Sequence, residues 1–102
     1  MRLRAALEQV FLVRRSGTVE ARLVVERESG ARERETLLLP VTDLAEAAVL
    51  VGRTVARRQD VTSVSRCRLR VARGSALEDD TALRDALRAA YRAERTRQEV
   101  DA

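Results

Sequence analysis

The chain has 102 residues, of which 45% are hydrophobic, and this predicts one compact domain with a real core and excludes a largely disordered protein. It carries 20 basic and 16 acidic residues for a formal net charge of +4, with no histidine and a single cysteine, Cys67, so an internal disulfide and the usual metal sites are excluded. The least charged stretch, 41–52, contains Asp43 and Glu46 and is shorter than the roughly 20 apolar residues of a membrane span. The basic N-terminus reaches Glu8 before a secretory apolar region can form. We therefore predict a mature cytoplasmic protein with no membrane contact, metal or cofactor.

The first part of the chain has the pattern of a three-stranded β-meander. Residues 16–17 and 29–30, both Ser-Gly, separate runs in which apolar and polar residues alternate, as in β-hairpins. The first strand includes residues 10–13, the second extends over 18–28, and the third covers roughly 32–41.

The length of the second loop decides which face the third strand presents. A two-residue loop would place Thr36 opposite Leu23, which puts a polar residue on the apolar face. A three-residue loop, 29–31, instead places Leu37 opposite Leu23. Because a shift of one residue inverts the faces of a strand, we predict the longer loop, with its glycine in the left-handed conformation.

The third strand ends at Pro40, and Thr42 or Asp43 begins a helix that extends to about Gln59. Apolar residues occupy almost the full circumference of its first two turns, which is more than one sheet can bury. We therefore predict that part of this helix contacts a second copy of the chain. The alternative is that the C-terminal helix covers this surface within one chain. The candidate interface residues are Leu44, Ala47, Val49 and Leu50.

Alternation returns from residue 61 to residue 73, which predicts a fourth strand with Cys67 on its apolar side. Gly74 and Ser75 end this strand, and Asp79 or Asp80 begins a second helix.

The resulting order, βββαβα, predicts an α+β fold: an antiparallel β-meander, a helix, a fourth strand and a C-terminal helix, with both helices on one face of a four-stranded sheet. Residues 1–94 form the single domain, and residues 95–102 form a frayed C-terminal tail. Residues 1–9 fit either a strand or a helix, and we predict a strand.

Every basic residue is an arginine, and the joint absence of lysine, isoleucine and asparagine is typical of a GC-rich genome, so the positions of the arginines matter more than their number. Seven of them lie between Arg53 and Arg73, together with a single acid, Asp60. Arg66, Arg68 and Arg70 alternate along the predicted fourth strand and so share one face of the sheet, about 6.6 Å apart, a spacing that suits successive phosphates of an extended polyanion. An ordinary solvated face with cross-strand ion pairs is the alternative. The candidate polyanion-binding residues are Arg53, Arg57, Arg58, Arg66, Arg68 and Arg70.

No pattern of residues predicts catalysis. The thiol of Cys67 has no histidine to activate it, and the four glycines are too scattered to form a phosphate-binding loop. We therefore predict a small, basic, non-enzymatic domain that acts by protein interaction and self-associates through its first helix as a homo-oligomer, in the simplest case a dimer. Binding of nucleic acid or another polyanion by the arginine-rich sheet face is the alternative.

Overall fold

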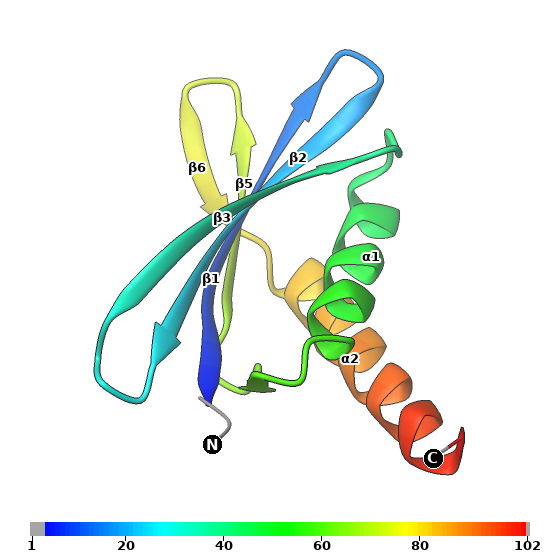
Figure 1. Cartoon of the computed structure of the whole chain (residues 1–102). Coiled ribbons are helices and arrows are strands. Elements are labelled where there is room, and N and C mark those ends of the chain that lie inside the picture. Colours follow the sequence, from blue (N-terminus) through cyan, green and yellow to red (C-terminus); the bar gives the residue numbers. More distant parts are fainter. Residues whose placement is uncertain (1–3, 102) are drawn as a thin grey trace.

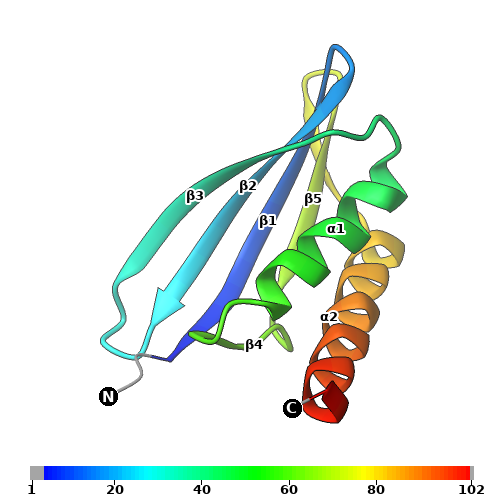
Figure 2. The same ribbon diagram turned by 45° about the vertical axis from the view of Figure 1, so that its right-hand side comes forward.

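A computed structural model describes residues 4–101 of the chain. Its elements are the strands β1 (Ala5–Arg15), β2 (Thr18–Arg27) and β3 (Arg32–Leu39), the helix α1 (Leu44–Ala56), the strands β4 (Val61–Ser63), β5 (Arg68–Arg73) and β6 (Ala76–Asp79), and the helix α2 (Thr81–Asp101). The predicted α+β class is confirmed, and Figures 1 and 2 show α1 and α2 together on one face of the sheet. Neither helix in this part of the chain is long and apolar enough to cross a membrane.

The sheet is mixed and six-stranded, so the expectation of a four-stranded antiparallel sheet is wrong. Its strand order is β3-β2-β1-β5-β6, and β4 pairs with β1 beside this path. The β1–β2, β2–β3 and β5–β6 pairs are antiparallel, whereas β4 and β5 are parallel to β1. The reason is the crossover through α1, which returns the chain along the length of the sheet, so that the next strands run in the same direction as β1.

The segment 61–73 is not one strand, as the sequence predicts, but two. The chain turns between β4 and β5, where the N–H of Cys67 donates to the carbonyl oxygen of Val64 at 3.2 Å. This break lies beside the bulge of β1 between Leu7 and Gln9, which interrupts the regular ladder at the same level. Gly74, with a φ of 63°, then forms a tight turn into β6, a strand that the sequence analysis does not predict.

The register of β2 and β3 differs from the prediction by two residues. Leu23 lies opposite Glu35, and Leu37 lies opposite Ala21 instead of Leu23. The loop has three residues, but they are 28–30, because the N–H of Arg27 donates to the carbonyl oxygen of Ala31 at 2.8 Å. A shift of two residues keeps each side chain on its predicted face. The predicted left-handed conformation of Gly30 is confirmed by its φ of 88°.

Acidic side chains cap both helices. Asp43 accepts a hydrogen bond from the N–H of Glu46 at 3.3 Å, and Asp80 accepts one from the N–H of Leu83 at 3.0 Å. The first helix ends at Ala56 instead of Gln59. The two helices pack on the inner face of the sheet and bury a core that includes Leu7, Leu12, Leu23, Leu69 and Leu87.

The two ends of the chain bear on two further predictions. The strand predicted near the N-terminus is present from Ala5 onward, and residues 1–3 lie outside the described residues. The helix α2 extends through the segment assigned above to a frayed tail, as far as Asp101, and residue 102 lies outside the described part. Within that segment, the guanidinium of Arg95 donates to the carbonyl oxygens of Arg58 and Val61.

Candidate functional site

The four candidate interface residues of α1 do not lie on one surface. Leu44 and Ala47 belong to the core, with exposed fractions of 8% and 0%. Val49 and Leu50 are half-buried. The rest of the wide apolar surface of α1 packs against α2, and the closest approach is at Gly52, where a Cβ atom would overlap the carbonyl oxygen of Leu87. The C-terminal helix therefore covers much of the surface that the sequence analysis assigns to a partner.

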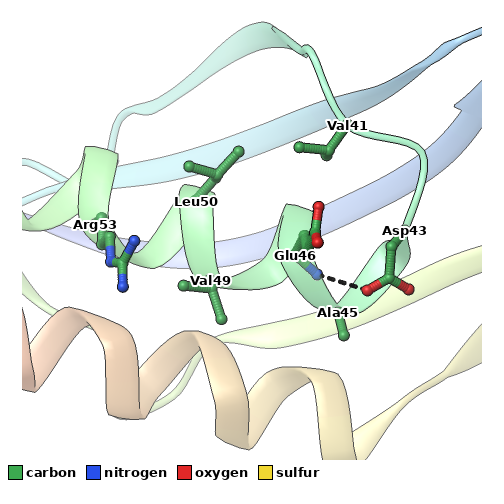
Figure 3. Close-up of a pocket in the computed structure, with 7 residues that line it drawn as sticks. All are labelled: Val41, Asp43, Ala45, Glu46, Val49, Leu50 and Arg53. Atoms are coloured by element: carbon green, nitrogen blue, oxygen red, sulfur yellow. Dashed lines mark hydrogen bonds between the residues drawn. The ribbon is translucent and has the colours of Figure 1, made fainter.

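The part of α1 that α2 leaves uncovered forms a shallow hollow, which we call the α1 hollow. Figure 3 shows Ala45 and Val49 on the side of this hollow toward α2, and Val41 and Leu50 on the opposite side. The N–H of Val41 donates to the carbonyl oxygen of Leu39 at 2.8 Å, which folds the chain after β3 back toward the helix. The α1 hollow is lined by Val41, Asp43, Ala45, Glu46, Val49, Leu50 and Arg53.

The charged residues of the α1 hollow are separated along the helix. Asp43 and Glu46 lie at the N-terminal end of α1, where acids are favoured by the helix dipole. Arg53 lies in the last turn and has no acidic partner within residues 4–100. The apolar floor is therefore bounded by negative charge at one end and positive charge at the other.

Among the candidate polyanion-binding residues, Arg58 is held within the fold. Its guanidinium donates to both carboxylate oxygens of Glu35, at 2.7 and 2.6 Å, and to both of Asp60, at 3.2 and 3.1 Å. Asp60 also accepts a hydrogen bond from Arg27 at 2.8 Å. These contacts tie the end of α1 to β2 and β3. The neighbouring Arg57 is exposed and lies 3.6 Å from the carboxylate of Glu94.

This network shifts the pKa of its central acid. The hydrogen bonds from Arg58 lower the pKa of Asp60 from 3.8 to about 2; burial opposes the shift, and the bond from Arg27 adds to it. The pKa of Arg58 is raised by the same hydrogen bond to Asp60.

Acid should weaken the fold through Asp60. Because its pKa is lower in the folded chain than in the unfolded chain, its stabilisation is complete above pH 3.8 and is lost as the pH falls toward about 2. We expect the free energy of unfolding of the natural chain, measured by urea denaturation, to fall more steeply over this range than that of Asp60→Asn. Parallel curves for the two proteins would contradict this assignment.

The structure breaks the row of arginines that the sequence predicts on the fourth strand, Arg66, Arg68 and Arg70. Arg66 lies in the turn before β5, so it does not share a strand face with Arg68 and Arg70, as the sequence analysis expects. Arg68 and Arg70 both approach the carboxylate of Asp79 on β6, at 3.6 and 3.3 Å. Of the six candidates, only Arg53 and Arg66 have no acidic partner within the described residues.

The face of the sheet opposite the helices is less basic than expected and partly apolar. Cross-strand neighbours place Phe11 beside Arg22 and Arg70, and Leu77 beside Ala72. Leu77 is 57% exposed. Sequence analysis misses this patch because it misses β6, although Gly74-Ser75 is the same kind of glycine-containing turn signal that identifies the first two hairpins. Apolar residues of this face are Phe11, Val13, Val24, Leu38, Ala72 and Leu77.

The single thiol does not lie at any of these surfaces. Cys67 is buried, and burial raises its pKa to about 11, opposed by the positive charges of Arg88 and Arg84. The thiol is therefore protonated near neutral pH, where nucleophilic attack needs the thiolate.

Comparison of the chain with protein-family models, with curated proteins and with solved structures finds no match in any of the three. Inference about function therefore depends on the contacts and exposure of the chain's own residues.

Proposed function

We propose that this protein acts by binding protein, and that it self-associates through the α1 hollow. The observation that carries this proposal is a partly exposed apolar floor, formed by Val41 before α1 and by Ala45, Val49 and Leu50 of α1, whose other apolar residues are buried. Covering such a floor removes apolar area from water, which is the main favourable term in most protein association.

The charges around the α1 hollow favour a second copy as the partner. In a dimer whose two-fold axis is perpendicular to α1, the two α1 helices run antiparallel, and each surface meets its own copy. Glu46 at one end of the hollow then lies toward Arg53 of the other copy, and the reverse pair forms as well. The separation of acid and base along α1 is thus self-complementary, and such complementarity suppresses wrong partners more than it adds affinity.

The arginines give less support to polyanion binding. Arg58, Arg68 and Arg70 already donate to or approach carboxylates, so each phosphate contact would first have to displace an ion pair. Of the six candidate residues, only Arg53 in α1 and Arg66 in the turn before β5 are without an acidic partner among residues 4–100. Self-association is therefore the better supported function.

The test introduces a charge at the centre of the α1 hollow. We expect the natural chain to sediment as a dimer, and Leu50→Glu and Val49→Glu each to raise the dimer dissociation constant at least tenfold, because a buried unpaired carboxylate is costly. Sedimentation equilibrium measures the mass, and circular dichroism confirms the fold.

Val100→Glu is the matched control, since Val100 is 78% exposed near the end of α2. This variant should dimerise like the natural chain. A monomeric natural chain, or unchanged dimerisation in both Leu50→Glu and Val49→Glu, would overturn the proposed function.

A further inference from the structure

The outer edge of β3 offers a second set of contacts to a partner. This strand is the last in the sheet order, and within residues 4–101 no strand pairs with its outer side. Figure 2 shows β3 as a long outer strand beside β2. An unpaired edge presents a row of backbone N–H and C=O groups that another strand can bind.

The register identifies which backbone groups of β3 point outward. Arg27 and Ala31 form a hydrogen-bonded pair, and such pairs recur at every second position of an antiparallel ladder. With the observed register, the next hydrogen-bonded pairs along β3 are therefore Val25–Glu33, Leu23–Glu35 and Ala21–Leu37. It follows that the odd-numbered residues of β3 bond to β2. The outward N–H and C=O groups belong to Arg32, Arg34, Thr36 and Leu38.

Two of the structural devices that block edge pairing, bulges and proline, are absent from Arg32–Leu39, and the charged residues of this strand are confined to its first half, Arg32–Glu35. The β2–β3 ladder is regular over its eight residue pairs, with no bulge that would bend β3 away from a partner, and Leu38 on this strand is 70% exposed. The opposite edge of the sheet is different, because β6 has only four residues, too few to template a long ladder.

We propose that β3 pairs antiparallel with β3 of a second copy, with Thr36 opposite Thr36 of that copy. This inference rests on the proposed function, self-association, and specifies how the second copy is bound. The pairing joins the two sheets into one, and each copy supplies its outward N–H and C=O groups to the other.

Parity, charge and the length of the ladder together select this register. The outward-pointing groups lie on even-numbered residues, so a hydrogen-bonded ladder must match even residues with even ones. Pairing centred on Arg34 would oppose two arginines and also set Glu33 against Glu35, and pairing centred on Glu35 would oppose two glutamates, which is destabilising. Centring on Thr36 sets Arg34 against Leu38 and Glu35 against Leu37, with no like charges opposed. Centring on Leu37 also opposes no like charges, but within β3 that ladder extends only over residues 35–39, whereas the ladder centred on Thr36 extends over 33–39.

The same symmetry places the α1 hollow near the partner. A two-fold axis perpendicular to the joined sheet leaves both α1 helices on one face of it. The side of the hollow that carries Val41 and Leu50 points away from α2 (Figure 3), and Glu35 of β3 holds the end of α1 through Arg58 at 2.6 Å. The uncovered flank of α1 and the edge of β3 thus belong to one side of the molecule.

The first test removes one outward N–H. Thr36→Pro eliminates a donor to the second copy and leaves the β2–β3 bonds intact, because the N–H of an even-numbered residue of β3 does not face β2. We expect it to raise the dimer dissociation constant at least tenfold in sedimentation equilibrium. Thr36→Val, which keeps the N–H and the branched side chain, should dimerise like the natural chain, and equal dimerisation of the proline and valine variants would overturn the proposal.

The second test reads the register directly. Opposed residues of a hydrogen-bonded antiparallel pair have Cα atoms about 5.5 Å apart, within the range of a disulfide. Thr36→Cys should therefore form a covalent dimer on mild oxidation. Arg34→Cys should not, because Arg34 of the two copies would be separated by about four residues of strand, roughly 13 Å. The natural chain, whose Cys67 is buried, serves as the uncrosslinked control.

The two tests separate failure of this inference from failure of the proposed function. A natural chain that sediments as a monomer overturns both. The natural chain could dimerise, with Leu50→Glu and Val49→Glu raising the dissociation constant, while Thr36→Pro leaves it unchanged and Thr36→Cys forms no crosslink. That result would overturn only the β3 pairing. Preferential crosslinking of Arg34→Cys overturns the proposed register.

Discussion

Replacing Gly52 with valine is expected to lower the free energy of unfolding by about 3 kcal/mol, the upper end of the usual cost of overpacking. Gly52 is where α1 meets α2, and an added Cβ would overlap the carbonyl oxygen of Leu87 and lie 3.0 Å from the Cβ of Ala90. The overlapped atom belongs to the backbone of α2, so it cannot move aside as a flexible side chain does. The two helices must separate to accept the valine, and urea denaturation at a fixed protein concentration measures the cost.

Ala93→Val is the matched control for Gly52→Val. Ala93 is exposed in α2, so this change introduces the same β-branched side chain into a helix without a clash. It should cost only a few tenths of a kcal/mol, the difference in helix propensity. If both variants lost the same stability, the close approach of α1 and α2 at Gly52 would be contradicted.

The contact at Gly52 also determines which part of α1 is available to a partner. Because α2 packs closely there, the apolar residues on that side of α1 are covered within one chain, and only the α1 hollow stays open. Separation of the helices in Gly52→Val should expose further apolar surface. We therefore expect this variant to bind a hydrophobic dye more strongly than Ala93→Val does.

The sequence predicts the long elements of this fold well, because their patterns are strong. Alternation over β2 and the glycines at its two ends identify both hairpins, and Gly30 has the expected left-handed conformation. The capping residues Asp43 and Asp80 are among those expected. Each of these signals is local, so a single sequence is enough to read it.

Features that depend on distant contacts are predicted less well. The direction of β5 relative to β1 depends on the crossover through α1, which the alternation of residues does not encode. The predicted register of β2 and β3 is wrong by two residues, because the alternation of residues determines which face each side chain lies on but not which residues of the two strands are opposed. The four residues of β6 are too few to show a clear period.

In the candidate sites, too, the sequence predicts the local features but not those that depend on distant contacts. The sequence shows that α1 has more apolar surface than one sheet needs, but it does not show that α2 covers the side at Gly52. It shows a concentration of arginines, but not their partners: Glu35 is 23 residues from Arg58, and Asp79 belongs to the strand that was not predicted. Ion pairing across such separations is a property of the fold.

Replacing Arg58 with methionine tests whether this arginine serves the fold or a polyanion, and we expect it to cost about 2 kcal/mol of unfolding free energy. Hydrogen bonds that involve charged groups contribute about 1.5–3 kcal/mol, and the partial exposure of this network reduces that value. Arg58 donates to Glu35 and Asp60, and its loss leaves the carboxylate of Glu35 without this partner, while Arg27 still holds Asp60. Urea denaturation at neutral pH measures the difference.

Arg66→Met is the control, because it removes the same charge at an exposed residue of the turn before β5 that has no acidic partner in the described part of the chain and lies outside the α1 hollow. It should change the unfolding free energy by less than about 0.5 kcal/mol, as surface substitutions usually do. Both variants are then titrated against a labelled oligonucleotide at low salt. A structural role for Arg58 requires that Arg58→Met lose stability and bind the oligonucleotide no more weakly than Arg66→Met does. Unchanged stability with a selective loss of oligonucleotide binding would instead assign Arg58 to a polyanion site, since only a residue free of its carboxylate partners is available to phosphate.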